Sequence, residues 1–128
     1  MAIHERDTQP VATDETPSLI SSDKVEGTSV YNRQGDKLGS IETLMIDKIG
    51  GQVRYAVMSF GGFLGMGEDY HPLPWSALTY DTRRDGYVID MDKARLEMAP
   101  HYSRSDSSAW TNPRWGREVD SYYGVRPM

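Results

Sequence analysis

A glycine-rich stretch is the first place where this sequence could do chemistry. Residues 61–67 read Gly-Gly-Phe-Leu-Gly-Met-Gly, and closely spaced glycines allow backbone N–H groups to surround a phosphate. A phosphate loop also needs a helix N-terminus behind it and usually a lysine, whereas two acidic residues follow here and would repel an anion. The stretch favours either a loop that closes one end of the fold or a partner-binding loop that presents Phe63, Leu64 and Met66.

Histidines are the next candidates, for metal ligation or acid–base chemistry, and they occur at His4, His71 and His101. A metal site would require carboxylates such as those of Asp69 or Asp81 to converge with His71. The spacing does not predict that convergence, and no order of Ser, His and acidic residues indicates a catalytic triad. The sequence therefore predicts no catalytic residue, no metal site and no bound cofactor, and we expect a protein that is not an enzyme.

Trp75 allows two interpretations. It directly follows Pro74 at the expected end of a strand, where a large aromatic side chain typically anchors a core. Alternatively, Trp75 and loop 61–70 line a small pocket, and the chain is a small-ligand-binding module.

The C-terminal part of the chain carries an aromatic helix face. The spacing i, i+4, i+7 and i+8 places four side chains on one side of a helix: Trp115, Val119, Tyr122 and Tyr123. Trp110 precedes them. A single helix of this length is marginal in water, so its apolar face must pack either on its own barrel or on a second subunit. Aromatic side chains are enriched at interfaces, which favours a homodimer, and both alternatives stay open.

The expected ends of this helix come from its punctuation. Asn112 is an N-cap candidate, Pro113 suits the first helical position, and Gly124 suits the residue after the last turn.

Composition excludes several classes of function. The net charge is −5 and cysteine is absent, so disulfides and thiol chemistry are excluded and no basic excess favours nucleic acid as a partner. No apolar run approaches the ~20 residues of a membrane span, and the first residues lack the apolar core of a secretory signal. These features predict a cytoplasmic protein without an integral membrane segment.

The element that organises the chain is a strand over residues 53–60. Apolar side chains alternate on both of its faces, which is typical of a central strand that is covered on both sides. The preceding strand, 37–47, loses its alternation near Thr43, which predicts a β-bulge there. Gly39 within that strand predicts a close backbone approach.

The remaining signals are short strands and turns. Residues 28–31 predict a strand, residues 70–74 with their two prolines an edge strand, and Asp85-Gly86 the turn of a hairpin. Trp75–Leu78 predicts one helical or 3₁₀ turn, and Asp92 caps a short helix over residues 93–98. Many short strands without a long helix predict an all-β fold, as a small barrel or sandwich.

The expected organisation has three parts. Residues 1–17 are polar and predict a flexible N-terminal tail, residues 18–99 form the barrel domain, and residues 100–128 form a C-terminal linker followed by the amphipathic aromatic helix. Within that part, His101 to Ser108 is expected to be a polar linker.

An ordered set of blocks resembles the PRC-barrel family. The blocks are Gly35–Ile41, Leu44–Asp47, Gly51–Val57, Gly61–Gly67 and Leu73–Leu78, and the resemblance covers roughly residues 18–98. It implies an all-β, PRC-type barrel related to the cytoplasmic domain of the photosynthetic reaction centre H subunit and to the C-terminal domain of the ribosome maturation factor RimM. Because family members include small stand-alone bacterial proteins, it also implies a bacterial protein of that kind, used for protein–protein contacts and without catalytic residues.

From these signals we expect a non-enzymatic protein-interaction or adaptor module that self-associates. Its expected contact residues are those of the loop and the aromatic tail: Phe63, Leu64, Met66, Trp110, Trp115, Val119, Tyr122 and Tyr123. The alternatives are the small-ligand-binding module described above and a ribosome-assembly accessory factor. The protein partner and the process are not identified by the sequence.

Overall fold

The computed structural model describes residues 11–61, 68–106 and 108–126. In this part of the chain seven strands form one sheet in the order β5-β6-β1-β2-β3-β4-β7. Their bounds are β1 Ser29–Tyr31, β2 Lys37–Ile46, β3 Val53–Gly61, β4 Glu68–Pro74, β5 Leu78–Asp81, β6 Gly86–Ile89 and β7 Tyr102–Ser103. Neighbouring strands are antiparallel except for β1 and β6, which are parallel.

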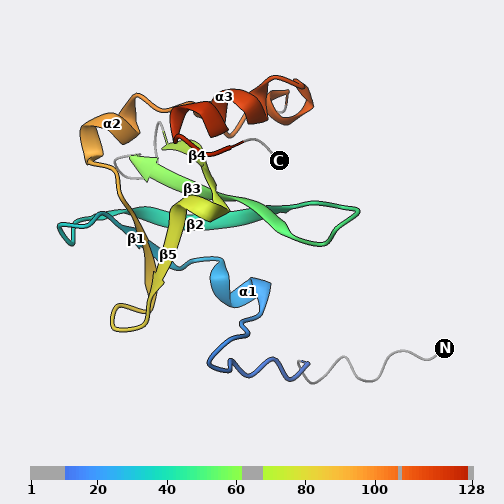
Figure 1. The fold of residues 1–128 in the computed structure, drawn as a ribbon, viewed down its shortest axis with the longest axis vertical. Coiled ribbons are helices and arrows are strands. Elements are labelled where there is room, and N and C mark those ends of the chain that lie inside the picture. The colour runs from blue at the N-terminus through green and yellow to red at the C-terminus, as the bar shows by residue number, and fades with distance from the viewer. Residues whose placement is uncertain (1–10, 62–67, 107, 127–128) are drawn as a thin grey trace.

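The all-β class predicted from the sequence is confirmed, and the sheet is strongly twisted. Strands β2 and β3 run across β1 and β5 in Figure 1. Since β5 and β7 are the outermost strands, the sheet among the described residues is not closed into a complete barrel. Helices α2 (Lys93–Glu97) and α3 (Trp115–Tyr122) lie on one side of it, and α1 (Ser22–Val25) lies with the N-terminal arm on the other (Figure 1).

Strand β3 is central, as its pattern predicts. Ala56, Met58 and Phe60 lie in the main hydrophobic core, and Tyr55 and Val57 are buried on the opposite face. Both faces of the strand are covered, because the core fills one of them and the C-terminal segment contacts the other. On that second face the ring centroids of Tyr55 and Trp110 are 5.6 Å apart. The core also contains Val25, Val30, Leu38, Ile41, Leu73, Tyr87, Ile89, Met91 and Leu96.

Strand β2 contains the predicted irregularity. Its register against β3 shifts between Ile41 and Thr43, and again between Met45 and Ile46. The prediction of a close approach at Gly39 is also confirmed, since a Cβ atom built there would lie 2.1 Å from the carbonyl oxygen of Ser59. Only glycine allows the two strands to come this close.

The turns follow their local signals. The hairpin that joins β5 and β6 closes at Asp85, whose φ is +50°, and Gly86 follows it. Gly35, in the turn between β1 and β2, has a φ of +94°, and the Asn32 and Asp36 side chains bind each other across that turn at 3.2 Å. A 3₁₀ turn at Trp75–Ala77 connects β4 to β5, as predicted.

The caps of the helices agree with the sequence at α2 and differ at α3. Asp92 accepts a hydrogen bond from the backbone N–H of Arg95 at 2.8 Å, which is the expected N-cap. The prediction that α3 begins after Asn112 is wrong by two residues, because the Asn112 side chain accepts from the N–H of Arg114 at 2.9 Å and holds a turn before the helix. Gly124 has a φ of +70° and ends the helix as predicted.

The prediction of an edge strand at residues 70–74 requires a correction. Strand β7 pairs with Asp69 and Tyr70, so β4 is an outer strand only beyond that point, where Pro72 and Pro74 remove two backbone donors. Strand β7 lies within the predicted polar linker from His101 to Ser108, since it consists of Tyr102 and Ser103.

None of the helices in the described part of the chain has the length and hydrophobicity needed to span a bilayer.

Candidate functional site

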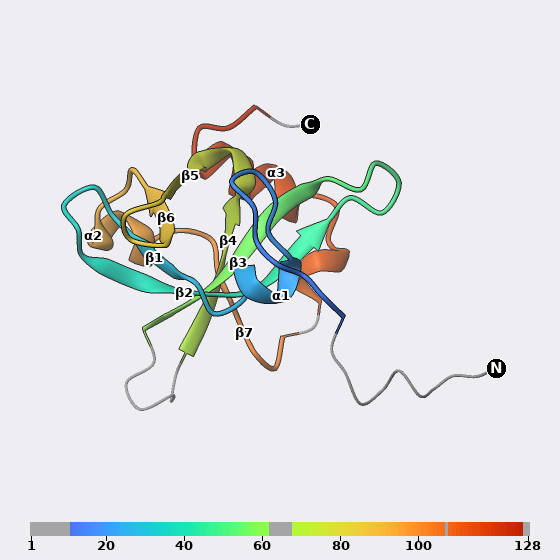
Figure 2. The ribbon, with the colours of Figure 1, turned by 90° about the horizontal axis from the view of Figure 1, so that it is seen from below.

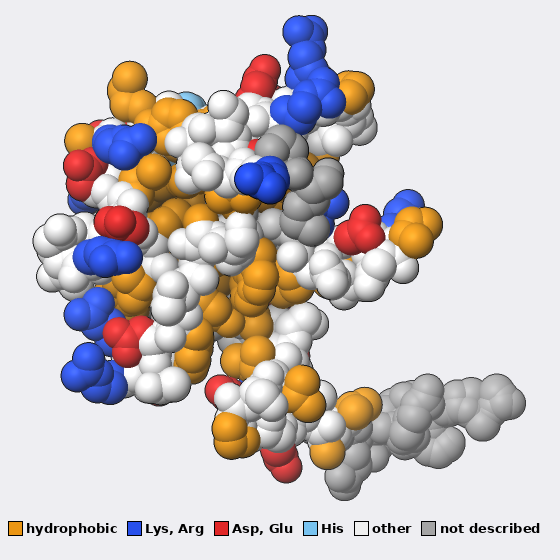
Figure 3. Space-filling model, viewed as in Figure 1, with side chains coloured by type: hydrophobic (Ala, Val, Ile, Leu, Met, Phe, Trp, Pro, Cys, Tyr) orange, Lys and Arg blue, Asp and Glu red, His pale blue; other side chains and the backbone are white. Residues whose placement is uncertain are grey.

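A hollow lined mainly by apolar side chains lies beside Trp75. It has a volume of about 330 Å³ and lies between the segment 15–20 and the strands β5 and β6. The side chains that line it from the sheet are Trp75, Leu78, Tyr80 and Tyr87. Figure 3 shows hydrophobic side chains gathered in the hollow between the body of the molecule and its N-terminal arm. We call this site the Trp75 hollow.

The sheet wall of the Trp75 hollow is aromatic because of the β5–β6 register. Tyr80 and Tyr87 are directly opposed on neighbouring strands, and their ring centroids are 5.1 Å apart at an interplanar angle of 64°. The Trp75 ring lies 5.4 Å from that of Tyr87 at 56°. Tyr87 is buried, whereas Trp75 and Tyr80 are partly exposed.

The other wall is the segment 15–20. Hydrogen bonds within the N-terminal arm hold this segment in place. The N–H of Thr16 donates to the carbonyl of Leu19 at 2.9 Å, and the N–H of Leu19 donates to the Thr16 hydroxyl at 2.8 Å. The Lys24 ammonium donates to the carbonyl of Thr13 at 2.8 Å. Leu19 is 70% exposed, so the arm shapes the hollow without filling it. Figure 2 views the molecule from the side on which this arm lies.

Glu15 places a negative charge at the Trp75 hollow. Burial, and after it the charge of Glu15, raises the pKa of Tyr80. Burial, Tyr80 and Glu15 in turn raise the pKa of Tyr87. Both phenols are therefore protonated at neutral pH, and the hollow combines aromatic rings with one carboxylate.

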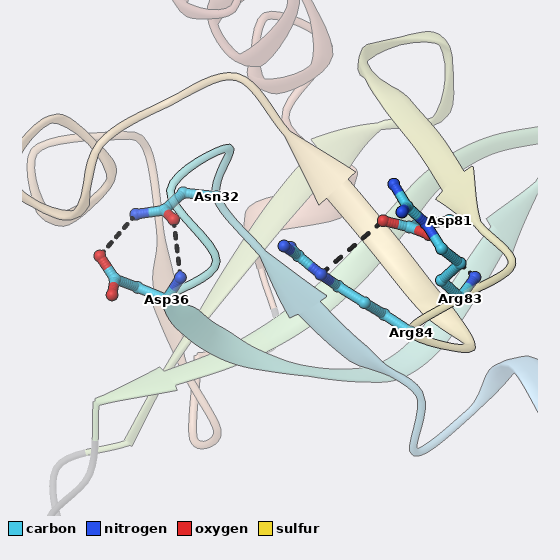
Figure 4. Close-up of polar contacts among 5 residues, drawn as sticks. All are labelled: Asn32, Asp36, Asp81, Arg83 and Arg84. Carbon is cyan, nitrogen blue, oxygen red and sulfur yellow. Dashed lines mark hydrogen bonds and ion pairs between the residues drawn. The ribbon is translucent and has the colours of Figure 1, made fainter.

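A larger and more polar groove lies on the other side of the β5–β6 hairpin. It has a volume of about 630 Å³ and is lined in part by Arg33, Arg83 and Arg84. Figure 4 shows the Arg84 guanidinium beside the Asp81 carboxylate, 3.7 Å away, and Arg33 pairs with Asp90 at 3.5 Å. Two of the three guanidinium groups therefore already face carboxylates, which weakens the attraction of the groove for an anion.

Arg84 has a structural role instead. Its guanidinium lies 5.3 Å from the centre of the Tyr31 ring, so the side chain connects the β5–β6 hairpin to β1.

His71 is buried and lacks a hydrogen-bond partner at either ring nitrogen among the described residues. It stacks on His101 with centroids 5.1 Å apart and contacts the Phe60 ring edge at 5.1 Å. Burial, reinforced by the charge of His101, lowers the pKa of His71 to about 4, although Asp69 and the Leu96 backbone act in the opposite direction. His71 is therefore a neutral core residue at neutral pH.

No group of three or more His, Cys, Asp or Glu side chains in the described residues is arranged to hold a metal ion. The expected absence of catalytic residues and cofactors stays a prediction.

The aromatic tail packs on its own chain. Val119 is fully buried, and Tyr122 and Tyr123 pack against the core. The Tyr55 hydroxyl donates to Asp120 at 3.0 Å, and the Tyr122 hydroxyl donates to the carbonyl of Arg95 at 2.6 Å.

Trp110 and Trp115 complete an aromatic cluster over β4 and β7. Both contact the Tyr102 ring, with centroids at 6.1 and 6.2 Å, and the indole N–H of Trp110 donates to the Tyr102 hydroxyl at 3.1 Å. The structure thus realises the intramolecular alternative for this helix face. Whether the protein also self-associates stays a prediction.

Two sets of predicted site residues have different outcomes. Phe63, Leu64 and Met66 lie outside the described residues. Trp75 does line a pocket, but the opposite wall is the segment 15–20, and the described residues of loop 61–70 do not contribute to it.

Sequence reasoning missed Glu15, Tyr80 and Tyr87. The two tyrosines could have been found, because the Asp-Gly turn at residues 85–86 fixes a register that places them opposite each other. Glu15 gave no signal, since it stands in a polar segment with no periodicity.

The blocks that suggested a family are confirmed by comparison. The PRC-barrel domain family matches residues 17–96. The chain belongs to the PRC-barrel family. Comparison with curated protein sequences gave no match.

Among solved structures, this PRC-barrel chain is similar to the 16S ribosomal RNA processing protein RimM from Pseudomonas aeruginosa. The identity is 22%, the TM-score is 0.37, and the match covers 66% of this chain and 50% of that one. The chain therefore corresponds to about half of that protein.

Proposed function

We propose that this chain is a non-enzymatic protein-interaction module that binds an apolar segment of a protein partner in the Trp75 hollow. The proposal rests on the hollow itself. The N-terminal arm borders the hollow but leaves the space in front of its aromatic wall unfilled. Binding hot spots are enriched in Trp and Tyr that sit in pockets, and concave apolar sites with a few polar groups are the usual binding sites.

The negative charge of the N-terminal arm indicates which residues flank the apolar part of the partner segment. The arm beside the hollow, residues 11–26, carries Asp14, Glu15, Asp23 and Glu26 against Lys24 alone. A partner segment with basic residues near its apolar anchor would complement this surface and associate faster.

The exposed rim of the hollow provides the test. Peptides selected from a displayed random library for binding to the wild-type chain are titrated by fluorescence anisotropy against Leu19→Asp. We expect the variant to bind at least ten times more weakly, because a charge then stands where the peptide buries its apolar anchor. Ile49→Asp is the matched control, since Ile49 is 93% exposed in the hairpin between β2 and β3 and does not line the hollow.

A second measurement locates the peptide. Amide shift changes in ¹H–¹⁵N spectra are expected at Leu78, Tyr80 and Tyr87. Shift changes confined to other surfaces, or equal binding by wild type and Leu19→Asp, would overturn the proposal.

A small ligand is the second candidate, favoured by the volume of the hollow. A cavity of about 330 Å³ is at the lower end of the range for ligand sites. A thermal-shift screen with quinones, nucleotides and metal ions tests it, because a ligand that binds only the folded state raises the melting temperature with its concentration.

Self-association and a ribosome-assembly role have separate tests. Sedimentation velocity over a range of concentrations measures the first, and co-sedimentation with ribosomal subunits measures the second. Because the aromatic face of α3 is packed on its own sheet, a dimer of this chain would use another surface.

A further inference from the structure

The side chains that line the Trp75 hollow indicate which chemical group it binds. Three aromatic rings line the same space, those of Trp75, Tyr80 and Tyr87. The Tyr87 ring is tilted relative to each of the other two. The face of an aromatic ring carries negative electrostatic potential, and sites built from several rings are a recurrent solution for binding alkylammonium groups.

A carboxylate completes the set. Glu15 is the only charged side chain among the described residues that line the hollow, and it forms no ion pair with a basic side chain in that part of the chain. A neutral occupant that covered this carboxylate would remove it from water without providing a partner, which is costly. An occupant with positive charge would provide that partner and contact the rings as well.

The volume of the Trp75 hollow suits a long basic side chain. The hollow is large enough for an alkyl chain that ends in an ammonium group, and its apolar residues Ile20 and Leu78 suit the alkyl part. A long basic side chain commonly buries its methylene groups along apolar surface while its charged end meets a polar partner.

We infer that the Trp75 hollow binds the ammonium group of a lysine side chain of the partner segment, in the unmodified or methylated form, between the rings and the Glu15 carboxylate. This inference rests on the proposed function and adds the chemical class of the group that is recognised.

The test compares two compounds of the same shape that differ in charge. Choline and its neutral counterpart 3,3-dimethylbutan-1-ol are titrated into the full chain, and the shifts of the Trp75 indole N–H and the Leu78 amide are followed. Butylammonium and butyltrimethylammonium are titrated in parallel to compare the unmodified and methylated lysine ends. We expect choline to bind at least five times more tightly than the alcohol, because only choline gains the interactions with the rings and the carboxylate.

Glu15→Gln removes the charge with almost no change in shape. We expect it to lower the affinity ratio of choline to alcohol at least twofold, because only the rings then favour the cation. Asp14→Asn, which changes a neighbouring carboxylate that does not line the hollow, should keep the ratio. The same two variants are also titrated with sodium chloride alone. Shifts of the same two signals in this control measure the effect of ionic strength.

Each outcome decides the inference. Equal affinity of choline and the alcohol for the wild type would overturn it and leave apolar docking in the hollow intact. Shifts with neither compound, or an unchanged ratio in Glu15→Gln, would overturn it as well. Failure of the proposed function is seen separately, as a library peptide whose binding is insensitive to Leu19→Asp.

Discussion

The hydroxyl of Tyr55 donates a hydrogen bond to the Asp120 carboxylate over 3.0 Å, and this contact fastens α3 to the centre of the sheet. Both side chains are buried, with exposed fractions of 7% for Tyr55 and 6% for Asp120. Burial, followed by the Asp120 interaction, raises the pKa of Tyr55 to about 12. The donor therefore keeps its proton at neutral pH.

Tyr55→Phe removes this donor and leaves the Asp120 carboxylate buried without it. We expect a loss of about 2 kcal/mol in the free energy of unfolding, the usual size for a hydrogen bond to a charged group. Urea denaturation measures it. In the double variant Tyr55→Phe with Asp120→Asn, the loss should be smaller because no charge is left buried, and a double variant less stable than Tyr55→Phe would contradict the assignment.

Val119→Ala tests whether the helix packs on its own chain. Val119 is fully buried, and removing two methyl groups from a buried site costs about 2 kcal/mol. The loss should be the same at low and high protein concentration if α3 docks within one chain. If α3 instead docked on a second subunit, the free energy of unfolding of the wild type would itself decrease on dilution. Ser121→Ala on the exposed side of α3 is the control.

His71 predicts an acid-sensitive fold. Its pKa lies near 4 in the folded chain and near 6.5 when unfolded, so the unfolded state binds more protons between these values. Neutral His71 therefore makes its full contribution to the free energy of unfolding above pH 6.5. That contribution decreases by about 3 kcal/mol as the pH falls towards 4.

The measurement is the free energy of unfolding in urea at several pH values, compared with His71→Leu. Carboxylates titrate in both proteins, so the difference between the two curves isolates the histidine. Parallel curves between pH 7 and pH 4 would show that His71 is not the origin of the acid sensitivity.

Gly39→Ala should be the most damaging small substitution in the sheet. The new Cβ atom would collide with the carbonyl oxygen of Ser59, and the two strands would have to separate. We expect a loss of at least about 3 kcal/mol or failure to fold, measured by urea denaturation and by the soluble yield. Gly27→Ala is the control, because φ there is +89° but nothing lies within 4 Å, and its cost should stay near 1 kcal/mol.

Elements with a local cause were predicted from the sequence. Strand β3 follows from alternation on two faces, the bulge near Thr43 from a break in that alternation, and the cap at Asp92 from its side chain. The ordered blocks added the family, and with it the expected β-barrel class.

Features that depend on distant partners were not predicted. Strand β7 is two residues long and exists because Tyr102 meets Tyr70 on β4, and nothing in its own sequence indicates a strand. The Trp75 hollow requires the arm near Glu15 to lie against β5 and β6, a contact between segments about sixty residues apart. Sequence reasoning therefore found Trp75 but paired it with the nearest loop.

The parallel pairing of β1 with β6 has a consequence for how the chain reaches this fold. Val30 pairs with Tyr87 and Tyr31 with Val88, so this junction closes a long loop, whereas β2–β3 and β5–β6 form as local hairpins. Closing the long loop costs entropy before its contacts can compensate. Joining the β5–β6 hairpin to β1 should therefore limit the folding rate, and the Trp75 hollow would be among the last features of the molecule to form.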